Sequence, residues 1–165
     1  MNTYVYGDKI CELTNIQFFP VEYYNTYISK YNIANNIIYM RQVNKNKLID
    51  LKKPIIITKV EYLDNIYSII DTLKIPFVLI THYGGANAGN HRIKDHPLLI
   101  KWYGQNMSVI SEKTEAIPLG LQNPHWKKTD IDFINKNKHN DKTKLLYINL
   151  STKTFNLRGQ IINSL

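Results

Sequence analysis

The feature that most constrains the fold is a strand–helix–strand pattern in the middle of the chain. Pro54–Val60 (PIIITKV) and Ile75–Thr81 (IPFVLIT) are apolar and rich in β-branched residues, which is typical of strands buried on both faces of a sheet. The segment between them, Glu61–Lys74, carries apolar residues at the spacing of one helix face: Leu63, Ile66, Tyr67, Ile70 and Leu73. A helix that joins two such strands makes them parallel neighbours, so the pattern predicts an α/β fold with a parallel sheet.

Other short apolar runs extend this sheet. Asn36–Met40 (NIIYM), Lys113–Pro118 (KTEAIP) and Leu145–Leu150 (LLYINL) are predicted strands, and Met107–Ile110 is a weaker candidate. The first 30 residues are aromatic and irregular, and they either wrap an edge of the core or form an early strand and a short helix. We expect a Rossmann-like sandwich with a mainly parallel sheet.

A second helix is predicted after Asp95. Asp95 is a residue type that caps helix N-termini, and Pro97 suits the first turn that follows it. Leu98, Leu99, Trp102 and Tyr103 then repeat at helical spacing, and Gly104 would end the helix. A further helix is predicted from Asn156.

We place residues 1–144 in one Rossmann-like domain. The stretch Trp126–Lys144 is the most hydrophilic in the chain and predicts a surface loop or linker. Residues 145–165 look like the beginning of a second βα unit. They either close the first domain or connect it to another one.

Composition excludes several classes of protein. Of the 165 residues, 44% are hydrophobic and 21% charged, which is incompatible with wholesale disorder. No run of about 18 apolar residues is present, and the N-terminus has no signal-peptide pattern. The single cysteine, Cys11, allows neither an internal disulfide nor a cysteine zinc site. These features predict an intracellular, cytoplasmic protein without a membrane span.

The chain is basic, with a formal net charge of +8. Such a charge attracts phosphates of any kind, including those of nucleic acid. The lysines are thinly spread, however, and the abundance of Lys, Asn, Ile and Tyr is what A/T-rich codons produce. No strand interleaves aromatic and basic residues in the way that stacks bases. Nucleic acid is therefore an unlikely partner.

The glycine-rich segment His82–Arg92 is the first candidate for a site. It follows a predicted strand, and ligands of open α/β sheets bind beyond the carboxyl ends of the strands. Gly84, Gly85, Asn90 and His91 are its candidate binding residues. The spacing fits neither a phosphate loop nor a dinucleotide fingerprint. The segment is either a flexible solvent loop or a loop that faces a ligand.

His82 and Asp95 are the candidate acid–base residues. His82 directly follows a buried strand, where it is either a general base at the sheet edge or a hydrogen-bonded structural residue. Asp95 is the second candidate base, with helix capping as its alternative role. His82, His125 and His139 have no carboxylate or cysteine at metal-ligand spacing, and Pro97 and the loop context argue against a shared helical face for His91 and His96, so we predict no metal site.

Several segments, taken in order, are similar to one enzyme family. They are Phe77–His82, Asp95–Asn106, Lys113–Asn123 and Leu145–Leu150, the last followed by Asn156 and Arg158. They resemble the N-terminal half of exostosin-like GT-B glycosyltransferases of bacteria and large DNA viruses. The family pattern is a strand ending in Ser-His, a helix with Trp-Phe-x-x-Asn, and Ile-Pro-x-Gly-x-x-Asn. The resemblance covers about Ile75 to Arg158, and Tyr83-Gly84-Gly85 departs from the usual polar residues.

The resemblance implies a two-domain enzyme with its active site between two Rossmann-like domains. The N-terminal domain would hold a glycan or other hydroxyl acceptor. A C-terminal domain, expected to be missing here, would hold the nucleotide-sugar co-substrate, with no metal cofactor.

The resemblance also assigns residues to the two sides of that cleft. His82, Asn106, Gly120 and Asn123 occupy motif positions and are expected on the acceptor side, and Arg158 on the donor side. An inverting enzyme would need a base for the acceptor hydroxyl, with His82 first and Asp95 second. The alternative function is a non-catalytic ligand- or partner-binding module of the same fold.

Overall fold

The computed structural model describes residues 5, 7–19, 37–39, 53–121, 131–144 and 156–164. The chain divides into two compact units, Met1–Thr129 and Asp130–Leu165. This division precedes the boundary expected at 144/145, because the hydrophilic stretch Trp126–Lys144 contains a helix, α5 (Ile131–Asn137). The predicted helix from Asn156 is confirmed as α6 (Asn156–Asn163), whereas the predicted strand Leu145–Leu150 lies outside the described residues.

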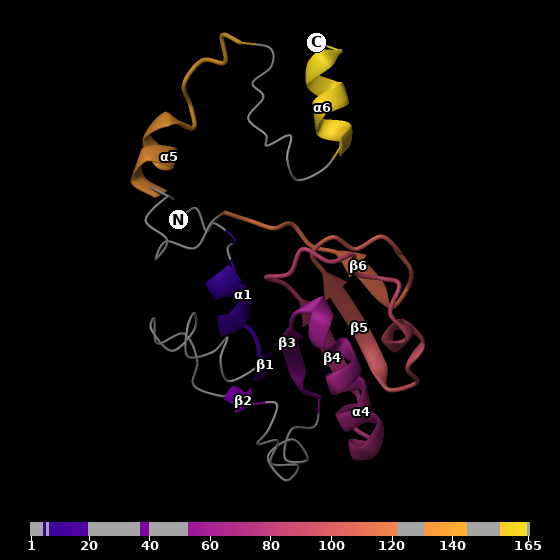
Figure 1. The fold of residues 1–165 in the computed structure, drawn as a ribbon. Helices are drawn as coiled ribbons and strands as arrows, with labels where there is room; N and C mark the ends of the chain where they lie inside the picture. Colours follow the sequence, from indigo (N-terminus) through magenta and orange to yellow (C-terminus); the bar gives the residue numbers. More distant parts are fainter. Residues whose placement is uncertain are drawn as a thin grey trace. The chain divides into compact units, whose positions relative to one another are not determined.

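The first unit is built on a six-stranded sheet in which every neighbouring pair of strands is parallel (Figure 1). The strands are β1 (Ile16–Phe19), β2 (Ile37–Tyr39), β3 (Ile55–Thr58), β4 (Phe77–Thr81), β5 (Leu99–Gly104) and β6 (Thr114–Ala116). Their order across the sheet is β2-β1-β3-β4-β5-β6. The predicted α/β, Rossmann-like class is confirmed, and the predicted strands in 36–40, 54–60 and 75–81 do lie in one parallel sheet.

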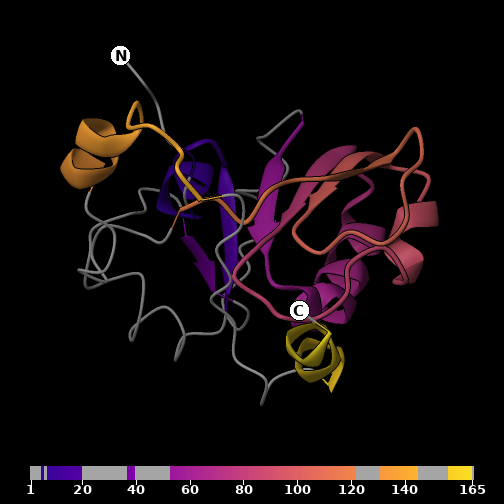
Figure 2. The same ribbon diagram turned by 90° about the horizontal axis from the view of Figure 1, so that it is seen from above.

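Helices cover both faces of this sheet, as Figure 2 shows from above. Helix α4 (Leu63–Leu73) packs on one face and α1 (Gly7–Glu12) on the other. The two faces arise because successive strand residues point in opposite directions. None of the described helices has the length and apolar character needed to cross a bilayer.

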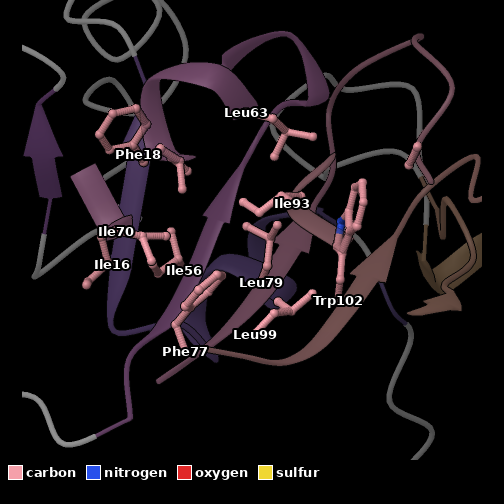
Figure 3. Close-up of a cluster of buried hydrophobic side chains, with 12 residues drawn as sticks. Ile16, Phe18, Ile56, Leu63, Ile70, Phe77, Leu79, Ile93, Leu99 and Trp102 are labelled. Carbon is pink, nitrogen blue, oxygen red and sulfur yellow. The ribbon is translucent and has the colours of Figure 1, made fainter. Parts of the chain in front are cut away.

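The larger core lies between α4 and the sheet (Figure 3). Helix α4 contributes Leu63, Ile66 and Ile70, the apolar face that its sequence spacing predicts. Every third or fourth residue of that helix meets the sheet, and its burial is the main favourable term in forming the unit. The buried sheet and loop residues of this core are Ile16, Phe18, Ile56, Phe77, Leu79, Ala88, Ile93, Leu99 and Trp102.

The predicted helix after Asp95 is wrong. Asp95 ends a short 3₁₀ helix, η4 (Arg92–Asp95), which His91 caps, and Leu99–Gly104 forms strand β5. The helical spacing of Leu99 and Trp102 has a local cause. Phe77 pairs with Leu99 and Val78 pairs with Lys101, so Ile100 is an extra residue in the strand. This bulge puts residues three apart on the same face of a strand, which imitates a helix in the sequence.

Three other predictions from the sequence have clear outcomes. Met107–Ile110 is not a strand, because Met107 forms only an isolated bridge with Ala88. The predicted strand Lys113–Pro118 is confirmed in its centre as β6. Of the two alternatives for the N-terminus, the described residues show a short helix and an early strand, α1 and β1.

A buried hydrogen bond ties β4 to β5 inside the main core. The Trp102 indole Nε1 donates to the Thr81 hydroxyl at 2.9 Å, and both side chains are fully buried. A polar N–H in this environment needs its partner, because an orphaned donor retains its desolvation cost.

We expect Thr81→Val to lower the free energy of unfolding by about 1–3 kcal/mol, because it leaves the indole N–H without an acceptor. Thr81→Ser is the matched control, since it keeps the hydroxyl and removes only a methyl group. Urea unfolding followed by circular dichroism measures both. Equal losses in the two variants would show that the hydrogen bond contributes nothing.

Candidate functional site

The strand order places the candidate site at the carboxyl-terminal ends of the strands, which we call the carboxyl edge of the sheet. From β1 the chain passes to β2 on one side and then to β3 on the other, so the direction of winding changes between β1 and β3. Ligands of such sheets bind beyond the carboxyl ends of the strands near this point. The residues that follow β3, β4, β5 and β6 therefore define the edge where a ligand is expected.

His82 lies at this edge, directly after β4, but its ring is buried. Only 4% of the residue is exposed, and its Nε2–H donates to the Leu119 carbonyl oxygen at 3.2 Å. Its Nδ1 has no hydrogen-bond partner among the described residues. Burial lowers the pKa of the imidazole, partly offset by the hydrogen bond to Leu119. His82 is therefore a neutral ring that joins the end of β4 to the turn before Gly120.

Tyr83 follows in a left-handed conformation, with φ of 67°. This conformation is rare for a bulky residue and is maintained only where its surroundings enforce it. Gln105, just after β5, stabilises this conformation through two hydrogen bonds. Its Oε1 accepts from the Tyr83 N–H at 3.2 Å, and its Nε2 donates to the Gly84 carbonyl at 3.0 Å. One side chain thus fixes both peptide groups of the Tyr83–Gly84 turn.

The ring of Tyr83 connects the same turn to α1. Its hydroxyl donates to Asp8 Oδ1 at 3.2 Å and lies 3.3 Å from the Cys11 sulfur. A Cβ on Gly7 would lie 2.6 Å from the ring, so the helix needs glycine there. Burial raises the pKa of the Cys11 thiol to about 12, which keeps it protonated and unreactive at neutral pH.

A carboxylate lies beside the next residue of the turn. Glu61 belongs to the 3₁₀ helix η3 (Val60–Tyr62), immediately after β3. A Cβ on Gly84 would lie 2.9 Å from Glu61 Oε2 and 3.2 Å from Oε1. By contrast, a Cβ on Gly85 would meet nothing within 4 Å. The edge thus combines an exposed carboxylate with a bare glycine backbone.

The turns after β5 and β6 also contain left-handed residues. Asn106 has φ of 56° and Gly120 has φ of 77°, and both are exposed. Together with Tyr83, they put one such residue after each of three neighbouring strands. We name the group Glu61, His82–Gly84, Gln105, Asn106 and Gly120 the carboxyl-edge site.

Asp95 lies at the amino-terminal ends of the strands, opposite to the carboxyl edge. It precedes β5, whose first residue, Leu99, pairs with Phe77 at the start of β4. The five residues of β4 separate its ends by about 13 Å. The Asp95 side chain is 74% exposed and pairs with Lys94 at 3.2 Å. His82 and Asp95 therefore do not share a site, because Asp95 precedes a strand rather than a helix.

Both ring nitrogens of His91 take part in hydrogen bonds within the fold. Its Nδ1 accepts from the Ile93 N–H, and its Nε2 pairs with Asp64 Oδ1 at 3.1 Å. This hydrogen bond is the main reason that the pKa of Asp64 lies below its usual value. Arg92 also donates to Asp64 and stacks over the Tyr67 ring at 4.2 Å. The residues around His91 thus anchor the glycine-rich segment to α4.

Three further residues were predicted from the sequence as site residues. Asn90 is exposed, next to the His91 anchor. Asn123 lies outside the described residues. Arg158 belongs to α6, in the second unit. Among the described residues, no three His, Cys, Asp or Glu side chains gather as metal ligands would.

Sequence reasoning missed three members of the site: Glu61, Tyr83 and Gln105. A signal for Glu61 was present, because the rule that directs attention to strand ends applies to β3 as well as β4. Tyr83 lies in the glycine-rich segment and Gln105 directly follows β5, but the role of each depends on a contact with a distant part of the chain, which the sequence does not show.

The chain was compared with family models, curated proteins and solved structures, and none of them matches it. The likeness to exostosin-like glycosyltransferases therefore stays a prediction from the motif residues.

We expect the free energy of unfolding to fall as the pH drops below about 6.5. Burial lowers the pKa of His82 and of His96 in the folded chain, so the unfolded state binds more protons in this range. Each histidine contributes a slope of at most about 1.4 kcal/mol per pH unit. Urea unfolding on both sides of this pH measures the slope.

The double variant His82→Gln/His96→Asn is the control. Gln retains a donor for the Leu119 carbonyl, and Asn retains an acceptor for the Leu98 N–H that His96 Nδ1 binds at 3.1 Å. We expect a flatter pH dependence in this variant between pH 6.5 and the lower folded pKa values. An unchanged slope would show that other groups cause the effect.

Proposed function

We propose that residues 1–129 form the acceptor-binding domain of a nucleotide-sugar-dependent glycosyltransferase, with the acceptor at the carboxyl-edge site. The observation that carries this proposal is the convergence of three motif positions. His82, Asn106 and Gly120 follow β4, β5 and β6, so positions far apart in sequence lie along one edge of the sheet, although Asn106 follows a strand where the family pattern has a helix. This is the edge at which ligands of parallel α/β sheets bind.

The chemistry of the site suits a neutral, hydroxyl-rich ligand. Its polar groups are a carboxylate, side-chain amides and exposed backbone, which accept and donate hydrogen bonds to hydroxyl groups. The donor diphosphate would need clustered cations or a suitable helix N-terminus, which the proposal assigns to a second domain. A glycan or similar polyol is therefore the proposed acceptor.

In this proposal His82 positions the site. Its Nε2–H is used by the Leu119 carbonyl and its Nδ1 is buried, so the ring holds the turn before Gly120 against β4. The same burial favours a second candidate, a sugar-binding module that does no chemistry itself.

The test is amide chemical-shift mapping of the ¹⁵N-labelled chain with free glucose, galactose, mannose, N-acetylglucosamine and their disaccharides. We expect at least one saccharide to shift the amides of residues 81–85, 105–106 and 120. Half of a cleft should bind weakly, with a Kd of about 1 mM or above. Absence of binding by every saccharide, or shifts confined to other residues, would contradict the proposal, as would tight binding of UDP-glucose to this unit.

We expect His82→Ala to weaken saccharide binding by about three- to ten-fold, because the Leu119–Gly120 turn loses its tie to β4. His82→Gln should recover most of that loss, since its amide N–H can donate to the same carbonyl. Titrations of both variants by chemical shift provide the comparison. Equal weakening in both would mean that the imidazole itself contacts the acceptor.

A further inference from the structure

Glu61 and Gly84 form a matched pair across two strand ends. Glu61 follows β3, Gly84 follows β4, and these strands are parallel neighbours with Thr58 opposite Thr81. Both Glu61 oxygens lie within 3.2 Å of the position that a Cβ on Gly84 would occupy. The Glu61 carboxylate can occupy this position because residue 84 is a glycine and has no Cβ.

The glycine beneath the carboxylate is fixed. The Gly84 carbonyl accepts from Gln105 Nε2, and the Tyr83 N–H donates to Gln105 Oε1. The Glu61 residue nevertheless stays exposed. The fixed Gly84 backbone gives a ligand a preformed surface beside the carboxylate, which lowers the ordering cost of binding.

A carboxylate accepts hydrogen bonds and donates none, so its ligand must supply donors. Two neighbouring hydroxyl groups of a sugar meet this requirement with one bond to each oxygen. A cationic ligand would also bind a carboxylate, but the formal net charge of +8 opposes its approach to the chain.

We propose that Glu61 binds a pair of adjacent hydroxyl groups on the acceptor, and that Gly84 is needed to seat its carboxylate. This inference rests on the proposed function, since it names a specificity-determining residue within the carboxyl-edge site. It also implies discrimination. Acceptors with a carboxylate or phosphate at this position should bind poorly because of like-charge repulsion.

Two variants test the pair by different routes. Glu61→Gln replaces one acceptor oxygen by an amide and removes the charge. Gly84→Ala keeps the carboxylate but displaces it, and only the end of a flexible side chain must move. We expect each to raise the Kd for a saccharide that binds the wild type by about ten-fold. Melting temperatures should stay close to that of the wild type.

Glu112→Gln and Gly159→Ala are the matched controls. Glu112 is an exposed glutamate before β6, and a Cβ on Gly159 in α6 would meet nothing within 4 Å. Both should leave the Kd unchanged. If Gly84→Ala does not fold, the Glu61→Gln titration decides alone.

The outcomes separate this inference from the function on which it rests. Weaker binding in both variants supports it. Wild-type binding that Glu61→Gln leaves unchanged overturns the inference, whatever Gly84→Ala does, and the proposed function stands. If the wild type binds no saccharide, the proposed function fails and this inference fails with it.

Discussion

The parallel hydrogen-bond ladder that joins β3, β4 and β5 is the interaction on which the rest of the unit depends. It aligns Thr58, Thr81 and Gly104 across three strands, so the residues that follow them emerge at one edge. It also presents two apolar faces, and α4 and α1 bury them. Packing and site geometry thus have a common origin: the register that stabilises the core also determines which side chains meet at the edge.

The strand–helix–strand centre of the fold was predictable because its signals are local. β3, α4 and β4 each have an unbroken apolar pattern of their own period, and short connections leave few alternative topologies. β5 was not predictable in the same way. Its bulge at Ile100 places Leu99 and Trp102 on one face at helical spacing, and only the partner strand distinguishes the two readings.

The location of His82 and Gly120 after strands was predictable, because it follows from the strands alone. The site was not predictable where it depends on contacts between strand ends. Gln105 forms hydrogen bonds with the turn that follows another strand. Glu61 lies beside Gly84, where a side-chain Cβ would clash with its carboxylate. Asp95 was the second candidate base after His82, and its location at the other ends of the strands was missed for a related reason. Reading β5 as a helix hid the fact that the residues before it lie at the sheet's other edge.

Tyr83 has a consequence for how α1 and the sheet edge respond to each other. Its peptide N–H belongs to the turn that Gln105 holds, while its hydroxyl reaches Asp8 and its ring fills the space that Gly7 leaves open. A ligand that orders the Tyr83–Gly84 turn should also reduce local opening of α1, because the turn and the helix both contact Tyr83. Ligand binding at the edge should thus slow amide hydrogen exchange in α1, on the far side of the Tyr83 ring.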